Sequence, residues 1–319
     1  MIASRGATAR TSVPSLALLW TPRARPYDEL TMTGTDPTFE FWKMHGCGND
    51  FVVAAPEQLD ADWAAVARAV CDRHTGVGAD GLILVEPSQT ADRRMSIYNA
   101  DGSNGVMCGN GIRCFVKFLN DRGIVSAAGA VTIETDVGVL ETHSTLDAEG
   151  RVQRVRVAMG APALDPAALG VQIEEAPPVL DLPLEAADEG LNLTLVSMGN
   201  PHAVQFINGA PTDYDLARVG PAVERHPLFA ERTNFEVVRV IDRSTVEMRV
   251  WERGVGETQA CGSGACAVAV ASRLHGHVDD SVRVRLPGGE LMIEWDGDGV
   301  VYLEGPVAFV FESQWEGAE

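Results

Sequence analysis

The chain has 319 residues, of which 45% are hydrophobic and 22% are charged, and its formal net charge is −20. This length allows two domains with separate cores, and the acidic charge argues against nucleic acid or an anionic membrane surface as a partner. Six cysteines without a Cys-x-x-Cys pair, and no apolar stretch of about 18 residues, favour a cytoplasmic protein with free thiols, no disulfide scaffold and no transmembrane helix.

Residues 1–38 differ from the rest of the chain. They contain four arginines and no acidic residue before Asp28. We interpret them as an extension that is disordered or that results from a misassigned start codon, with Met32 as the true start. A targeting peptide and an expression tag are the alternatives.

The first helix that the sequence predicts covers residues 61–72. Its apolar side chains recur at helical spacing and would form one buried face. These side chains are Trp63, Val66, Ala67, Val70 and Cys71.

A similar sequence motif then occurs twice in the chain. Cys108-Gly-Asn-Gly and Cys261-Gly-Ser-Gly each precede a short apolar helical stretch, 112–119 and 265–274, and each stretch ends near a glycine. Cys114 and Cys266 fall within these stretches, so we expect them in the core.

The repeat continues downstream of both motifs. Residues 131–135 and 138–141 alternate like two strands joined by a turn, and so do residues 282–286 and 289–293. Val155-Arg-Val-Ala-Met-Gly-Ala-Pro parallels Val301-Tyr-Leu-Glu-Gly-Pro. Upstream, Lys43-Met-His-Gly-Cys-Gly-Asn-Asp-Phe loosely parallels Ser197-Met-Gly-Asn-Pro-His.

The sequence therefore predicts two homologous halves. The first covers residues 39–158 together with 306–319, because residues 307–315 form a strand that returns to it. The second covers residues 159–305. Two similar halves would pack about a pseudo-two-fold axis, so the two cysteine loops would face each other across a cleft.

Paired thiols suit the inversion of a carbon centre. One face of a planar carbanion needs a base and the other face needs an acid, so one thiol would start as thiolate and the other as thiol. A helix N-terminus can lower the pKa of each thiol toward neutrality. The open N–H groups of the glycine loops can bind a carboxylate, as can the Arg253 guanidinium.

At these residues the sequence resembles the diaminopimelate epimerase family. The matching motifs are Asn99-Ala-Asp-Gly-Ser, Cys108-Gly-Asn-Gly-Ile-Arg and Trp251-Glu-Arg-Gly-Val-Gly-Glu-Thr-Gln-Ala-Cys-Gly-Ser-Gly-Ala-Cys. The resemblance covers about residues 40–312. It implies an α/β (α+β) fold of two pseudo-symmetric halves, each with mixed, mostly antiparallel strands around a central helix, and an active site between the halves.

The resemblance also implies the chemistry. It indicates interconversion of L,L- and meso-diaminopimelate without a cofactor or metal, in lysine and peptidoglycan biosynthesis, by a homodimer. The expected catalytic residues are Cys108, Cys261, His202 and Glu252. The expected substrate-binding residues are Asn49, Asn99, Gly109, Asn110, Asn200, Asn234, Glu252, Arg253, Gly262 and Ser263.

Two positions depart from the family pattern. Gly81 replaces a glutamine that contacts substrate, and Cys47 replaces a leucine near Asn49, where it could form a third thiol close to the site. Two other functions stay open. A proline or hydroxyproline racemase shares paired cysteines but should have a smaller, more apolar pocket. A non-catalytic binding or dimerisation module on the same fold should lack one cysteine.

Overall fold

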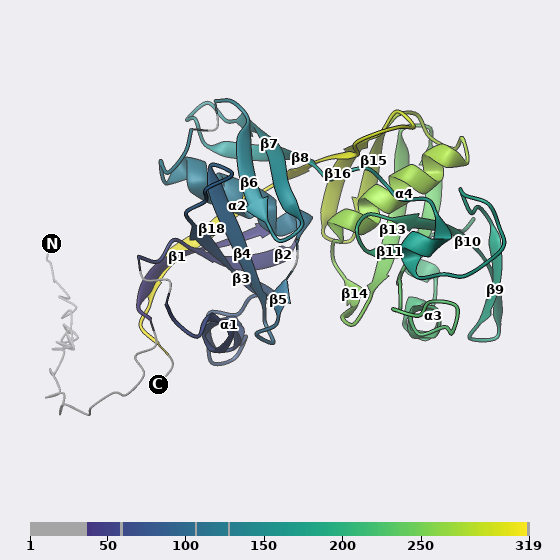
Figure 1. Ribbon diagram of the computed structural model, residues 1–319, viewed down its shortest axis with the longest axis horizontal. Helices are drawn as coiled ribbons and strands as arrows, with labels where there is room; N and C mark the ends of the chain where they lie inside the picture. Colours follow the sequence, from purple (N-terminus) through teal and green to yellow (C-terminus); the bar gives the residue numbers. More distant parts are fainter. Residues whose placement is uncertain (1–36, 58–59, 106, 127, 318–319) are drawn as a thin grey trace, which may run out of the picture. The chain divides into compact units, whose positions relative to one another are not determined.

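The computed structural model describes residues 37–57, 60–105, 107–126 and 128–317 (Figure 1). The extension predicted over residues 1–38 lies outside this part of the chain, apart from its last two residues. Among the described residues, no helix is long and apolar enough to cross a membrane.

Strands surround one long helix in the first half of the chain. Its elements are β1 (Phe39–Gly46), β2 (Asn49–Ala54), α1 (Trp63–Cys71), β3 (Gly81–Glu86), β4 (Arg93–Asn99), β5 (Asn104–Gly105), α2 (Gly109–Asp121), β6 (Val131–Thr135), β7 (Gly138–Leu146) and β8 (Val152–Ala158). Helix α2 contacts β1, β2, β3 and β8, so it lies inside the strands and is buried along most of its length.

The second half repeats this order after a short 3₁₀ turn, η1 (Pro166–Leu169). Its elements are β9 (Leu182–Ala186), β10 (Glu189–Ser197), β11 (Pro201–Phe206), η2 (Pro211–Asp213), α3 (Leu216–Glu224), β12 (Asn234–Asp242), β13 (Thr245–Glu252), β14 (Gly256–Thr258), α4 (Gly262–Leu274), β15 (Ser281–Leu286), β16 (Gly289–Glu294) and β17 (Tyr302–Pro306). Helix α4 is the inner helix here and contacts β10, β11, β12 and β16.

Strand pairing shows the repeat independently of the sequence. The parallel pairs β2–β3 and β4–β6 of the first half correspond to β11–β12 and β13–β15 of the second. The other pairings are antiparallel. The predicted fold class is therefore confirmed.

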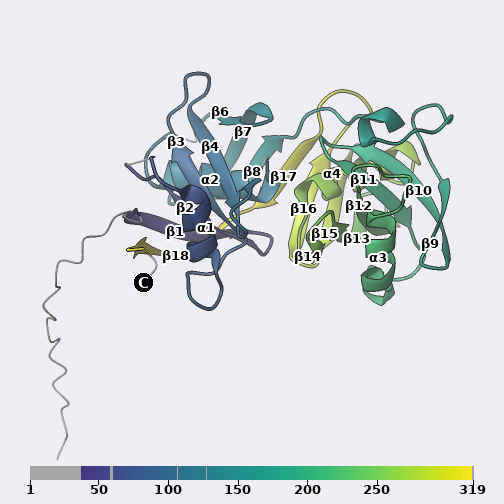
Figure 2. The same ribbon diagram turned by 60° about the horizontal axis from the view of Figure 1, so that its bottom comes forward.

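Two strand pairs join segments that are distant in sequence. Strand β18 (Ala308–Trp315) runs antiparallel to β1, so the end of the chain adds a strand to the first half. Strands β8 and β17 pair antiparallel and connect the halves, and they lie side by side in Figure 2.

Glycines end both inner helices as the sequence predicts. Gly123 follows α2 with φ +69°, and Gly276 follows α4 with φ +70°. Glycine adopts this left-handed conformation without the steric cost that a Cβ brings, so it commonly terminates helices. The five apolar residues predicted for the face of α1 are also the ones that the structure buries.

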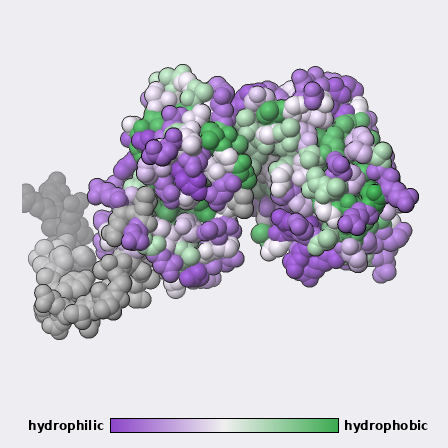
Figure 3. Space-filling view, in the orientation of Figure 1, coloured by the Kyte–Doolittle hydropathy of each residue, from purple (hydrophilic) through white to green (hydrophobic). Residues whose placement is uncertain are grey.

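The apolar core lies where the two inner helices meet the strands. One cluster contains residues of α2 and α4, including Phe115 and Val268, and two smaller clusters lie beneath α1 and α3. The predicted core cysteines Cys114 and Cys266 are fully buried in the first cluster. Hydrophilic residues cover much of the face of both halves that Figure 3 shows.

Candidate active site

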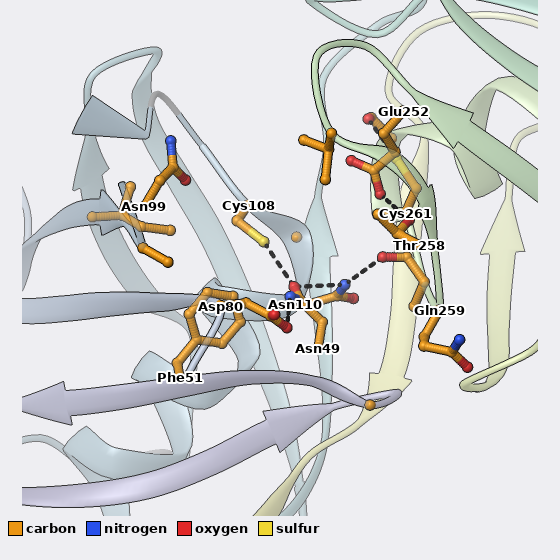
Figure 4. Close-up of a pocket in the computed structure, with 18 of the residues that line it drawn as sticks. Asn49, Phe51, Asp80, Asn99, Cys108, Asn110, Glu252, Thr258, Gln259 and Cys261 are labelled. Carbon is orange, nitrogen blue, oxygen red and sulfur yellow. Dashed lines mark hydrogen bonds between the residues drawn. The ribbon is translucent and has the colours of Figure 1, made fainter. Parts of the chain in front are cut away.

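A cavity of about 800 Å³ is lined by residues of both halves (Figure 4). Most of the residues predicted to form the site line it. They are Asn49, Asn99, Cys108, Gly109, Asn110, Asn200, Glu252, Cys261, Gly262 and Ser263.

The two cysteines occupy equivalent places, each as the N-cap of an inner helix. The Cys108 sulfur accepts the Gly111 N–H at 3.4 Å, at the start of α2. The Cys261 sulfur accepts the Gly264 N–H at 3.3 Å, at the start of α4. The prediction that each cysteine directly precedes a helix is therefore confirmed, and Figure 4 shows the two side chains on opposite walls of the cavity.

Glycines bring these helix ends together. A Cβ placed on Gly262 would lie 3.4 Å from the Gly109 Cα, so a single methyl group would fill the space between the first turns of α2 and α4. A Cβ on Gly264 would lie 2.9 Å from the Glu236 carboxylate, which is closer than real Cβ contacts allow. The Gly-x-Gly sequence is therefore needed for packing as well as for open N–H groups.

Burial acts on the two thiols more strongly than their helices do. It raises the pKa of Cys108, while the Gly111 and Asn110 N–H groups oppose the shift. It raises the pKa of Cys261 well above its ordinary value, and the Glu252 carboxylate raises it further. The expectation that helix N-termini bring both thiols toward neutrality is wrong in this structure, because desolvation of the thiolate outweighs those N–H groups.

Asparagines connect Cys108 to the other half. The Cys108 thiol donates to the Asn49 Oδ1 at 3.5 Å, and the Asn110 amide donates to the same oxygen at 3.1 Å. The Asn110 amide also donates to the Ala260 carbonyl at 3.1 Å, beside Cys261. Asn110 thus ties the two cysteine loops together across the cavity.

A fully buried cation lies beneath this connection. Arg113 donates to the Gly109 carbonyl and the Asn110 Oδ1, both at 2.8 Å, and to the Pro306 carbonyl at 3.2 Å. Among the described residues it pairs with no carboxylate, and its uncompensated charge opposes the rise in the pKa of Cys108 that burial causes.

A chain of side chains leads from Cys261 into the interior. The Cys261 sulfur lies 3.5 Å from the Ser263 hydroxyl, and the Asn200 amide donates to that hydroxyl at 3.3 Å. The Asn200 Oδ1 lies 3.0 Å from the His202 Nε2. His202 is fully buried behind the cavity wall, and its Nδ1 lies 2.6 Å from the Glu236 Oε1.

Glu252 lies at the end of β13, on the Cys261 side. The Thr258 hydroxyl donates to its Oε1, and both residues line the cavity. Burial raises the pKa of Glu252, while hydrogen bonds from Thr258 and Cys261 and the nearby His202 lower it. A carboxyl with such opposing influences is typical of a proton-transfer site.

Polar residues also line the cavity on the first-half side. The Asn49 amide donates to Asp80 at 2.7 Å, and Arg73 donates to the other oxygen of Asp80 at 2.8 Å. Asn99 donates to Ser103 at 2.9 Å. Gly81 begins β3 next to this group, and a side chain there would lie 2.8 Å from the Tyr98 carbonyl.

Three predicted residues lie off the cavity wall: His202, Asn234 and Arg253. The Asn234 amide donates to the Pro201 carbonyl at 2.9 Å, and its Oδ1 accepts the Arg253 N–H at 2.8 Å. The exposed Arg253 guanidinium donates to the Glu231 carbonyl at 3.1 Å. Asn234 therefore orients the turn that follows Glu252.

Cys47 does not line the cavity either. It is buried, and its sulfur lies 3.8 Å from the Arg113 guanidinium. Cys47 directly precedes Gly48, which lines the cavity, but its own side chain packs against Gly288 and Gly289 of the second half.

Sequence reasoning missed Glu236, Thr258 and the role of Arg113. The sequence did contain a sign of Glu236: it is an acidic residue inside the otherwise apolar strand sequence Asn-Phe-Glu-Val-Val. Within the described part of the chain, no group of three or more His, Cys, Asp or Glu side chains is placed to hold a metal ion.

Comparisons with known proteins identify the family. A family model described as diaminopimelate epimerase matches residues 41–164 and 194–310. A diaminopimelate epimerase from Moorella thermoacetica is 48% identical over 281 residues, which cover 86% of this chain and 98% of that relative. One from Desulforudis audaxviator is 49% identical over 280 residues, with 86% and 99% covered.

Solved structures share the fold at low sequence identity. A hydroxyproline epimerase from Agrobacterium vitis has a TM-score of 0.65 at 14% identity, and the match covers 88% of this chain and 93% of that one. A probable proline racemase from Agrobacterium radiobacter has a TM-score of 0.64 at 16% identity, with 86% and 92% covered. The family model and the close relatives show that this chain belongs to the diaminopimelate epimerase family.

Proposed function

We propose that this protein interconverts L,L- and meso-diaminopimelate by proton exchange between two thiols, without a cofactor. The observation that carries the proposal is the placement of Cys108 and Cys261 as equivalent helix N-caps on opposite walls of one cavity. One thiolate would remove the α-proton from one face, and the opposite thiol would deliver a proton to the other face.

The same helix ends supply a place for the reacting carboxylate. The first turns of α2 and α4 converge on the cavity at Gly109 and Gly262. Backbone N–H groups at a helix N-terminus bind anions and stabilise charge that grows on them in the transition state. The reacting α-carbon would then lie between the two sulfurs.

Burial raises the pKa of both thiols, so it disfavours the thiolate that the scheme requires. The nearby carboxyl of Glu252 accepts a hydrogen bond from Cys261 and is a suitable place for the proton that must leave one thiol. The pair would titrate as a coupled unit. His202, behind Asn200, would influence that step indirectly.

Polar lining of the cavity fits a substrate with two amino-acid centres. Asn49, Asp80, Asn99 and Arg73 provide charged and amide groups besides those near the thiols. A proline-sized substrate would leave them unused. We further propose a cytoplasmic homodimer acting in lysine and peptidoglycan biosynthesis, with domain limits at residues 39–158 plus 306–319 and 159–305.

A direct test incubates the reduced protein with L,L-diaminopimelate in D2O and follows deuterium at the α-carbon together with stereochemistry. Deuterium gain with conversion to the meso form is the expected result. Exchange on proline or hydroxyproline instead would keep the two thiols and change the substrate. No exchange on any of the three by folded protein would contradict an epimerase function.

A further inference from the structure

Glu236 is a fully buried carboxyl that the two-thiol scheme does not use. It lies on β12, whose residues pair in parallel with β11, and this pairing places it beside His202. Its Oε1 is 2.6 Å from the His202 Nδ1. Its Oε2 has no hydrogen-bond partner within the described part of the chain.

The unpartnered oxygen indicates where the shared proton lies. An anionic carboxylate oxygen buried without a donor costs far more than the carbonyl oxygen of a protonated acid. The Gly264 N–H, in the first turn of α4, donates to the Cys261 sulfur and is not available to Glu236. Burial also raises the pKa of Glu236, against the influence of His202. The favoured form is a neutral acid whose O–H donates to the Nδ1 of a neutral imidazole.

That proton fixes the direction of the hydrogen bonds up to Cys261. With Nδ1 accepting, the other nitrogen of His202 carries the hydrogen and donates to the Asn200 Oδ1. The Asn200 amide donates to the Ser263 oxygen. The Ser263 hydroxyl is then free to donate to the Cys261 sulfur, where it stabilises a thiolate.

In the described part of the first half, the thiol of Cys108 also contacts an asparagine, Asn49, but that asparagine leads to the exposed Asp80 and not to a buried histidine and acid. The register pairs Phe51 with Gly81 and His202 with Asn234, so Phe51 matches His202 and Ile83 matches Glu236. Steric contacts agree, since a Cβ on Gly111 would meet Ile83 and a Cβ on Gly264 would meet Glu236. Beneath Cys108 the two positions are thus apolar, and beneath Cys261 they are an acid and a histidine.

We propose that Glu236 is a positioning residue for Cys261: its acid proton, donated to the His202 Nδ1, orients His202, Asn200 and Ser263 so that a hydroxyl points at the Cys261 sulfur. The inference rests on the proposed function, since it concerns the same thiol. The titratable groups that face the pair are Glu252 on β13 and Cys261 at the start of α4.

The test combines ¹⁵N NMR of labelled histidine with kinetics on the full-length protein. A His202→Asn variant identifies the His202 signals among the seven histidines. In the unsubstituted protein we expect a neutral ring with the hydrogen on Nε2. Signals of a doubly protonated ring would overturn the proposal, because Glu236 would then be an anion.

Two substitutions of Glu236 separate positioning from simple packing. Glu236→Gln can still donate to Nδ1, so it should keep the Nε2–H form and stay within about threefold of the original kcat. Glu236→Ile copies the first half and should lose that preference. Its kcat should fall at least about tenfold. This is less than the roughly hundredfold or more that a placed acid–base group contributes, because Glu236 acts only through other residues.

A matched control uses Glu247, which forms a half-exposed ion pair with Arg239 on the same sheet. Glu247→Gln should change neither the His202 signals nor kcat. The inference fails if Glu236→Ile folds and leaves both readouts unchanged. Absence of diaminopimelate turnover in the unsubstituted protein would instead contradict the proposed function, and the NMR result would still stand alone.

Discussion

The two halves share a backbone fold but differ in the charged side chains around their inner helices. Each places a cysteine at the start of an inner helix, after a parallel strand pair. At the fifth position after the cysteine, the first half has the buried cation Arg113 and the second half has the neutral Cys266. Beneath the helix, the first half is apolar where the second has His202 and Glu236.

This difference shows how one repeated unit can serve two roles. The shared backbone places two thiols on opposite sides of the cavity, which inversion of a carbon centre requires. The unshared side chains shift the pKa values of the two thiols unequally. Burial and Glu252 raise the pKa of both thiols, that of Cys261 well above its ordinary value, whereas Arg113 opposes the rise at Cys108.

Removal of either thiol should have the largest effect. Cys108→Ala and Cys261→Ala should each lower epimerisation at least about a thousandfold, because a placed acid or base contributes roughly 10²–10⁴-fold and each direction needs both thiols. The conversion of L,L- to meso-diaminopimelate, followed by chiral chromatography, measures the loss.

Cys71→Ala is the matched control for those variants. Cys71 is buried beneath α1, in a cluster separate from the cavity. Its substitution should cost about 1 kcal/mol of stability through lost packing and leave turnover intact. Turnover near normal in either Cys108→Ala or Cys261→Ala would rule out the two-thiol scheme.

Loss of the buried cation should mainly destabilise the first half. Arg113→Met leaves the Gly109 and Pro306 carbonyls and the Asn110 amide oxygen without their donor, so the free energy of unfolding should fall by about 3 kcal/mol. Arg122→Met, which removes an exposed pair with Glu40 just after the same helix, should cost less than about 1 kcal/mol. Equal losses in urea denaturation would contradict the role given to Arg113.

The two equivalent glycines should respond unequally to alanine. In Gly111→Ala the new methyl meets the end of the Ile83 side chain at 3.0 Å, and in Gly264→Ala it meets the Glu236 carboxylate at 2.9 Å. An isoleucine methyl can turn away, but Glu236 is fixed by His202. We expect kcat for diaminopimelate epimerisation to fall more in Gly264→Ala than in Gly111→Ala. A larger fall in Gly111→Ala would contradict this difference between the two halves.

The smallest effect should come from the support of Glu252. Thr258→Val removes a hydroxyl that lowers the pKa of that carboxyl, so the pKa should rise further and the acid limb of the kcat/KM profile should move to higher pH. The rate at neutral pH should fall about tenfold, since a hydrogen bond to a charged group contributes about 1.5–3 kcal/mol. An unchanged pH profile would show that Thr258 does not influence Glu252.

Local patterns made much of the fold predictable. Glycines after α2 and α4 and the alternation in β6, β7, β15 and β16 gave elements close to the observed ones. Helix α3 was not predicted, because Gly220 and Pro221 interrupt its pattern. Gly220 is needed there, since a Cβ would lie 2.6 Å from Trp251.

The site was less predictable because it depends on contacts between distant segments. The pairing of His202 with Glu236 follows from the register of β11 on β12, which no local pattern reveals. The direction of the Arg253 side chain depends on the Glu231 carbonyl. The upward pKa shifts of the thiols depend on how far the two halves cover them, and Cys261 is buried whereas Cys108 is partly exposed.

The inequality of the two thiols can be measured directly. Alkylation of Cys108 and Cys261 by iodoacetamide, followed by mass spectrometry over a range of pH, reports the thiolate fraction of each. We predict that Cys108 reacts at lower pH than Cys261, because burial and Glu252 disfavour both thiolates, most strongly that of Cys261, whereas Arg113 favours the thiolate of Cys108. Reaction of Cys261 first, or of both at the same pH, would contradict it.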